Sequence, residues 1–105
     1  MKPLNLGKFS SMLSKFYNTY GNKYITDNLD INEPFHFNVF LRRSDFMDDM
    51  EKYDYIAEIY SYPSIPNNVD ISSLKKEFTK MLKYFDESFG NLTKATEIKF
   101  MDIQR

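Results

Sequence analysis

The sequence has no cysteine and a single histidine, His36. The absence of cysteine excludes disulfide bonds, thiolate zinc sites and cysteine nucleophiles within this chain. A histidine base needs a nucleophile and an orienting partner, and the spacing around His36 identifies neither. The three glycines are scattered, so no glycine-rich loop is available to cradle a phosphate. We therefore expect a protein that is not an enzyme and that uses no cofactor.

Long apolar runs and a dominant charge are also missing. The longest stretch without a charged residue, 59–69, contains two prolines, whereas a membrane span needs roughly 20 apolar residues. The start of the chain lacks the apolar run of a secretory signal. With 14 basic and 15 acidic residues the net charge is −1, which does not support nucleic-acid binding by bulk charge. These observations predict a cytoplasmic protein that does not contact membranes.

Aromatic residues are abundant, at 17 % of the 105 residues, and the chain is long enough for one domain. Apolar residues recur with helical spacing over 8–20, where Gly21 and Asn22 form a stop signal, and more clearly over 72–89. Asp70 or Ser72 is the expected cap of the second helix.

Strands are predicted where apolar residues alternate. The pattern indicates strands over 35–41, 54–62 and 95–103. Residues 53–62 also fit a helix, so that segment stays ambiguous. A short helix is expected to begin near Ser44, and loops are expected over 26–34 and 63–69. The whole chain, 1–105, is thus expected to form a single small α+β domain, with a three-stranded antiparallel or mixed sheet and two to three helices packed on one face.

The aromatic surplus is the most informative functional feature. A domain of this size cannot bury all its tyrosines, and exposed tyrosine near arginine is typical of protein-binding surfaces. The acidic cluster after the first strand could steer a basic partner; as a cation site it lacks further ligands. Arg42 and Arg43 could also hold a phosphate or form salt bridges with these acids. The predicted partner-binding residues are Phe40, Arg42, Arg43, Asp45, Asp48, Asp49, Tyr60 and Tyr62.

These features favour a protein-binding module, and the composition, rich in Asn, Lys and Ile, is typical of an AT-rich genome. An inhibitor or accessory factor of a phage or mobile element, which occupies the surface of a host or partner protein, would fit. The alternative is a nucleic-acid-binding regulator with a local lysine stripe on two helices. Self-association as a homodimer, through an uncovered strand edge, is compatible with both. The residues of the alternative are Lys8, Lys15, Lys76, Lys80 and Lys83.

Overall fold

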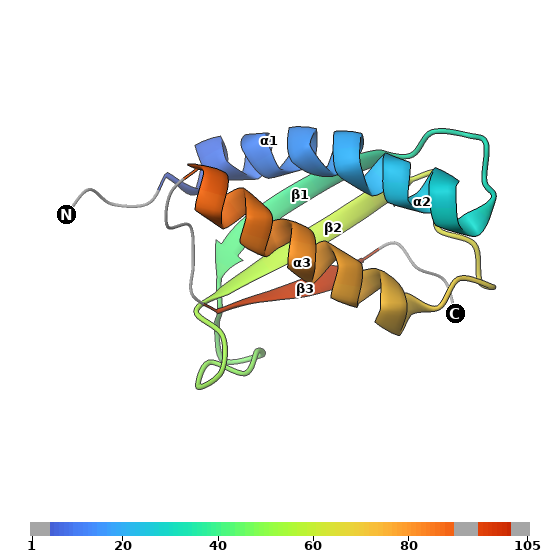
Figure 1. Ribbon diagram of the computed structural model, residues 1–105. Coiled ribbons are helices and arrows are strands. Elements are labelled where there is room, and N and C mark those ends of the chain that lie inside the picture. Colours follow the sequence, from blue (N-terminus) through green and yellow to red (C-terminus); the bar gives the residue numbers. More distant parts are fainter. Residues whose placement is uncertain (1–4, 90–94, 102–105) are drawn as a thin grey trace.

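The computed structural model describes residues 5–89 and 95–101, except for the side chains of residues 88 and 89. The elements follow in the order helix, strand, strand, helix, strand (Figure 1). Their bounds are α1 (Leu6–Phe16), the π-helical turn η1 (Tyr17–Gly21), α2 (Asn22–Leu29), β1 (His36–Arg43), β2 (Tyr55–Tyr62), α3 (Ile71–Phe89) and β3 (Thr96–Phe100).

The three strands form one mixed sheet in the order β1-β2-β3. β1 runs antiparallel to β2, with Leu41 opposite Ala57, and β2 runs parallel to β3, with Ala57 opposite Ile98. The α1–α2 run and α3 lie side by side over the same face of this sheet (Figure 1). The predicted fold class is confirmed, and the ambiguous segment 53–62 forms strand β2 from Tyr55 onward. The last two residues of the predicted strand 95–103 lie outside the described residues.

The first helix is longer than its sequence predicts. Instead of stopping at Gly21, the chain continues through η1 and α2 to Leu29, so the predicted loop 26–34 is wrong in its first half. Gly21 has ordinary helical angles, φ −66° and ψ −41°. A Cβ added there would lie 2.9 Å from Cζ of Phe78 and 3.2 Å from Cε2 of Phe37. Gly21 therefore serves close packing of the helix on the core, while Asp30, at φ 50°, ends the helix.

The core lies between the helices and the sheet. Phe37 of β1, Phe78 of α3 and Tyr17 of η1 are fully buried, and the Tyr17 and Phe78 rings stack at 4.7 Å. The Tyr17 hydroxyl donates to the Phe78 carbonyl at 3.2 Å, and burial raises the pKa of this phenol far above its usual range. Thus the only polar atom of this ring is satisfied inside the core.

α3 begins at the predicted cap. Asp70 accepts hydrogen bonds from the Ser72 backbone N–H at 3.1 Å and from the Ser73 hydroxyl at 2.8 Å. These bonds keep the pKa of the Asp70 carboxyl below its usual value. Asp70 rather than Ser72 is therefore the cap.

The connection between β1 and β2 contains no helix. The predicted short helix after Ser44 is replaced by consecutive turns over residues 44–54. Ser44 closes this loop instead of capping a helix, since its N–H donates to the Asp54 carbonyl at 2.9 Å and its hydroxyl donates to the Tyr53 carbonyl at 2.7 Å. Because β1 and β2 are antiparallel neighbours, the chain must return on itself here, and the ends of the loop are joined across the strand pair.

Side chains of the N-terminal helical run seal the free edge of β1. Four polar residues spaced four apart hydrogen-bond to alternate backbone groups of the strand: Ser10 to Leu41, Ser14 to Val39, Asn18 to Phe37, and Asn22 to Phe35 just before β1. The two serine hydroxyls each accept an N–H at 2.9 Å. Each asparagine accepts the N–H and also donates to the carbonyl of the same residue. The edge of β1 is therefore occupied without a further strand.

Candidate protein-binding surface

The face of the sheet opposite the helices, here called the outer face, has two different ends. Alternation along the strands places on it His36, Asn38, Phe40 and Arg42 of β1, Ile56, Glu58, Tyr60 and Tyr62 of β2, and Glu97 and Lys99 of β3. One end is aromatic and the other is ionic. None of the described helices packs on this face (Figure 1).

The aromatic end is exposed. Tyr62 is 80 % exposed and Phe40 55 % exposed, while Tyr60 is half-buried. The Phe40 and Tyr60 rings meet edge to face, with centroids 5.6 Å apart. Met101, which follows β3 and donates its N–H to the Ile59 carbonyl, is also exposed. This end therefore presents a contiguous aromatic pair beside a highly exposed tyrosine, without a covering element from the described chain.

The ionic end centres on Asp48 of the 44–54 loop. Its carboxylate contacts Nη1 of Arg42 at 2.7 Å and Nζ of Lys99 at 2.7 Å, and accepts the Asp45 N–H at 2.9 Å. Arg42 also binds Glu58 through Nε at 3.2 Å. The hydrogen bonds from Arg42 and Lys99 hold the pKa of the Asp48 carboxyl far below its usual range. Asp48 thus bridges β1 and β3 across the central strand.

This bridge explains a buried residue on the outer face. Ile56 is fully buried although it points away from the helices, and it does not belong to the helix-side core. Its strand neighbours are Arg42 and Glu97. Because Asp48 reaches Arg42 on one side of Ile56 and Lys99 on the other, the loop and its ion pairs lie over this end of the sheet.

The same loop exposes three large apolar side chains, Phe46, Met47 and Met50, at 87 %, 77 % and 57 %. The loop backbone around them is hydrogen-bonded: the Asp48 N–H donates to the Asp45 carbonyl, and the Met47 N–H donates to the Asp45 side chain, both at 2.9 Å. Sequence reasoning missed this group because its spacing mimics the apolar face of a helix. The available signal was the acidic residues that flank every one of them.

The predicted site residues are brought together only in part. Phe40, Arg42, Tyr60 and Tyr62 share the outer face, and Asp48 anchors the loop to it. Arg43 belongs to the other face, where its guanidinium lies 5.5 Å from the centre of the Tyr55 ring. The predicted acidic helix is absent, so Asp45, Asp48 and Asp49 do not line up. Asp45 and Asp49 are exposed on the loop, whereas the Asp48 side chain is shielded.

The remaining predicted groups are the acidic cluster, considered as a cation site, and the lysines of the nucleic-acid alternative. Asp48 already binds two cationic side chains, and no group of three potential metal-ligating residues occurs within residues 5–89 and 95–101. The lysines Lys8, Lys15, Lys76, Lys80 and Lys83 are exposed on α1 and α3, which cover the opposite face of the sheet.

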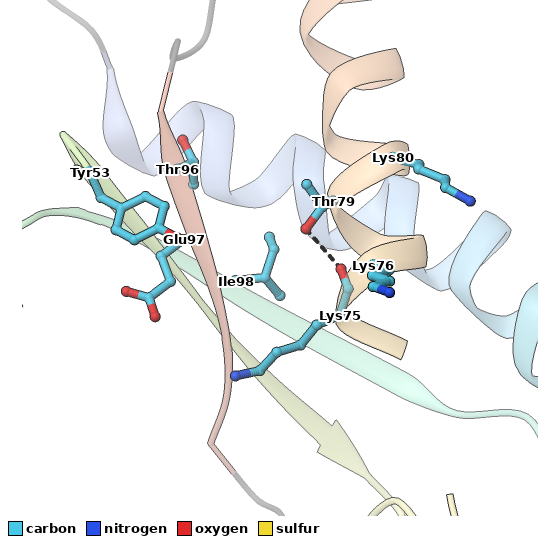
Figure 2. A pocket seen from close by; sticks show the side chains of 8 residues that line it. All are labelled: Tyr53, Lys75, Lys76, Thr79, Lys80, Thr96, Glu97 and Ile98. Atoms are coloured by element: carbon cyan, nitrogen blue, oxygen red, sulfur yellow. Dashed lines mark hydrogen bonds between the residues drawn. The ribbon is translucent and has the colours of Figure 1, made fainter. Parts of the chain in front are cut away.

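A groove of about 490 Å³ lies between α3 and β3 (Figure 2). Ile98 and Thr79 lie between its walls, and Lys75 extends from α3 toward the strand. Thr96 and Glu97 belong to the β3 wall, Tyr53 to the β1–β2 loop, and Lys76 and Lys80 to the helical wall. Thr79 is held by its own helix, since its hydroxyl donates to the Lys75 carbonyl at 2.8 Å.

Fold and surface together define a small α+β domain whose sheet is covered by helices on one face and carries exposed aromatic residues on the other. Comparison with protein-family models, curated protein sequences and solved structures finds no match to this chain. Among the helices described, none is both long and apolar enough to cross a membrane.

Proposed function

We propose that this protein acts by binding another protein through its outer face and the 44–54 loop. The observation that carries the proposal is the exposure of large apolar side chains on a well-bonded framework. These side chains are Phe40, Tyr62, Phe46, Met47 and Met50. Exposed large apolar groups on a small domain are typical of interaction sites. The ion pairs of Asp48 tie the loop to the sheet, which lowers the entropy lost when a partner binds it.

The charges around the apolar groups indicate the kind of partner. Asp45 and Asp49 are exposed beside Phe46 and Met50 on the loop. A complementary partner offers an apolar depression with a basic rim, and the acidic residues would speed the encounter. The finer proposal is that this binding occupies a functional surface of the partner, as an inhibitor or accessory factor of a phage or mobile element would do.

The distribution of cations favours protein over nucleic acid as the partner. Stacking of bases on aromatic side chains needs cations nearby to neutralise the phosphates. On the outer face, Arg42 and Lys99 are already engaged by Asp48, and Arg42 also by Glu58. The lysines of α1 and α3 lie on the opposite side of the sheet from Phe40 and Tyr62. The aromatic residues of the outer face and the lysines of α1 and α3 are therefore not available to the same strand of nucleic acid.

The proposal is tested by capturing partners with the tagged protein, with and without nuclease, and comparing two variants. The double variant Phe40→Ser/Tyr62→Ser removes the exposed rings of the outer face. The control variant, Tyr84→Ser, removes a ring from α3 on the helical side. This ring is 55 % exposed, as is that of Phe40. Affinity for the captured protein, purified and measured by calorimetry, is expected to fall roughly tenfold or more for the double variant and little for the control.

Two results would contradict the proposal. A partner that binds the wild type and the double variant equally would remove the outer face from the interface. Loss of the captured partner on nuclease treatment would favour the alternative, nucleic-acid binding by Lys76, Lys80 and Lys83. Circular dichroism of both variants checks that the fold is retained, which we expect because the replaced rings are largely exposed.

A further inference from the structure

A second binding site is indicated at the outer edge of β3. The bonds that join the ends of this strand to β2 use Ala95, whose carbonyl accepts the Tyr55 N–H, and Met101, whose N–H donates to the Ile59 carbonyl. Because backbone groups of successive strand residues point to opposite edges, Ile98 and Phe100 direct their N–H and C=O groups away from β2. Within the described part of the chain, no side chain or further strand bonds to these groups.

The edge of β3 lies beside the groove between β3 and α3 (Figure 2). The helical wall of this groove is basic, with Lys75, Lys76 and Lys80 on it. Lys75 reaches toward β3, while Lys80 lies 3.1 Å from Glu77 on its own helix. A strand laid along β3 would therefore meet backbone groups on one side and lysines on its helix-facing side.

We propose that this groove binds an extended, acidic segment of another protein, which adds to β3 as a fourth strand. Main-chain bonds to Ile98 and Phe100 would hold the segment, and acidic side chains at every second position would face Lys75 and Lys76. The side chains between them would face outward, on the side of Glu97 and Lys99. This site is separate from the aromatic end of the outer face and does not depend on the function proposed above.

Charge decides against a second copy of this chain as the occupant. Antiparallel pairing of two β3 strands would bring Lys75 and Lys76 of one copy toward the same lysines of the other. Like charges held near each other oppose such pairing. The competing explanation is that Lys75 only prevents other strands from pairing with β3, since lysines along edge strands disfavour such pairing. The two explanations differ in whether an acidic strand is accepted.

The test uses two synthetic peptides of equal length, one alternating glutamate with valine and one alternating lysine with valine. Binding is followed by nuclear magnetic resonance of the backbone amides. We expect the glutamate peptide to shift and protect the amides of Ile98 and Phe100 and the lysine peptide to leave them unchanged. The double variant Lys75→Glu/Lys76→Glu should bind the glutamate peptide roughly tenfold or more weakly, because two attractive contacts become repulsive.

Two controls locate the effect. Lys83→Glu changes a lysine of the same helix that does not line the groove, and should leave the affinity unchanged within about twofold. Phe40→Ser/Tyr62→Ser should also bind the peptide normally, so failure of one site is distinguished from failure of the other. The inference is overturned if the two peptides bind equally, if the shifts fall elsewhere, or if no shift reaches Ile98 and Phe100. Dimerisation through β3 in sedimentation experiments would overturn it as well.

Discussion

The backbone groups at the two edges of the sheet have different surroundings. At the β1 edge, four side chains of the N-terminal helical run replace a neighbouring strand and satisfy alternate backbone groups. At the β3 edge, the element alongside is α3, which contributes lysines to a groove; within the described residues it makes no hydrogen bond to the backbone of Ile98 or Phe100. A helix beside a strand thus seals an edge only when its facing residues can donate and accept at the right intervals.

At the β1 edge, the spacing of the helix side chains nearly matches the spacing of the strand residues that they bind. Four residues of α-helix rise about 6.0 Å, and two residues of strand advance about 6.8 Å, so each helical step meets every second strand residue. Shorter serines serve the first two positions, and longer asparagines serve the last two. A stripe spaced by four residues drifts around an α-helix, because each step exceeds one turn of 3.6 residues. The π-helical turn η1, between Asn18 and Asn22, has more residues per turn and therefore reduces that drift.

Among variants at the two edges, Asn18→Ala is expected to lower the free energy of unfolding the most. The amide of Asn18 accepts the Phe37 N–H at 2.7 Å and donates to the Phe37 carbonyl at 3.0 Å. Without it, two backbone groups of a buried residue lose their partner, which should lower the free energy of unfolding by about 3 kcal/mol. Urea denaturation measures this loss. The neighbouring Thr19→Ala, which removes only a bond to Lys15 within the helix, should cost less than about 1 kcal/mol. Equal losses would show that Asn18 does not seal the edge.

A smaller effect is expected from Ser14→Ala. Its hydroxyl accepts one N–H, that of Val39, at 2.9 Å. One unsatisfied donor should lower the free energy of unfolding by about 1–2 kcal/mol. The exposed Ser11, changed to Ala in the same helix, is the matched control and should change stability by less than about 0.5 kcal/mol. If both serine variants were equally stable, water would be an adequate substitute for the side chain at this edge.

The smallest effect on stability is expected from Lys75→Met on the other edge. This change keeps the length of the side chain and removes its charge, so the free energy of unfolding should move by less than about 0.5 kcal/mol. Hydrogen exchange sharpens the contrast between edges. The amides of Phe37 and Val39 should exchange slowly, since side chains bind them, and those of Ile98 and Phe100 faster. Slow exchange at all four amides would mean that β3 is sealed as well.

Much of the fold could be predicted, because α3, β1 and β3 carry clear apolar periodicities, while the segment that contains β2 also fits a helix. Predictions failed where a local signal was overridden by distant residues. Gly21 is a normal stop signal, yet the helix continues because the missing side chain lets it approach Phe37 and Phe78. Turns replace the predicted helix after Ser44, where Asp48 binds Lys99, 51 residues farther along the chain.

The candidate surface was predicted in part for the same reason. Alternation alone places Phe40 and Arg42 on one side of a strand, and Tyr60 and Tyr62 on one side of another. It does not say whether the two sides coincide. The antiparallel register, with Asn38 opposite Tyr60, decides that they do, and the helices on the other face decide that they remain exposed.

The sequence by itself determined the apolar periodicity of α1, α3, β1 and β3 and the absence of thiol chemistry within this chain, because these depend on residue type and short-range spacing. Tertiary structure decided which polar stripe would meet a strand edge and which would face water. The positions of Ser10, Ser14, Asn18 and Asn22 suit an exposed helix face equally well. Only the approach of β1 to that face turns four ordinary polar residues into the seal of a sheet, since a hydrogen bond requires its partner within reach.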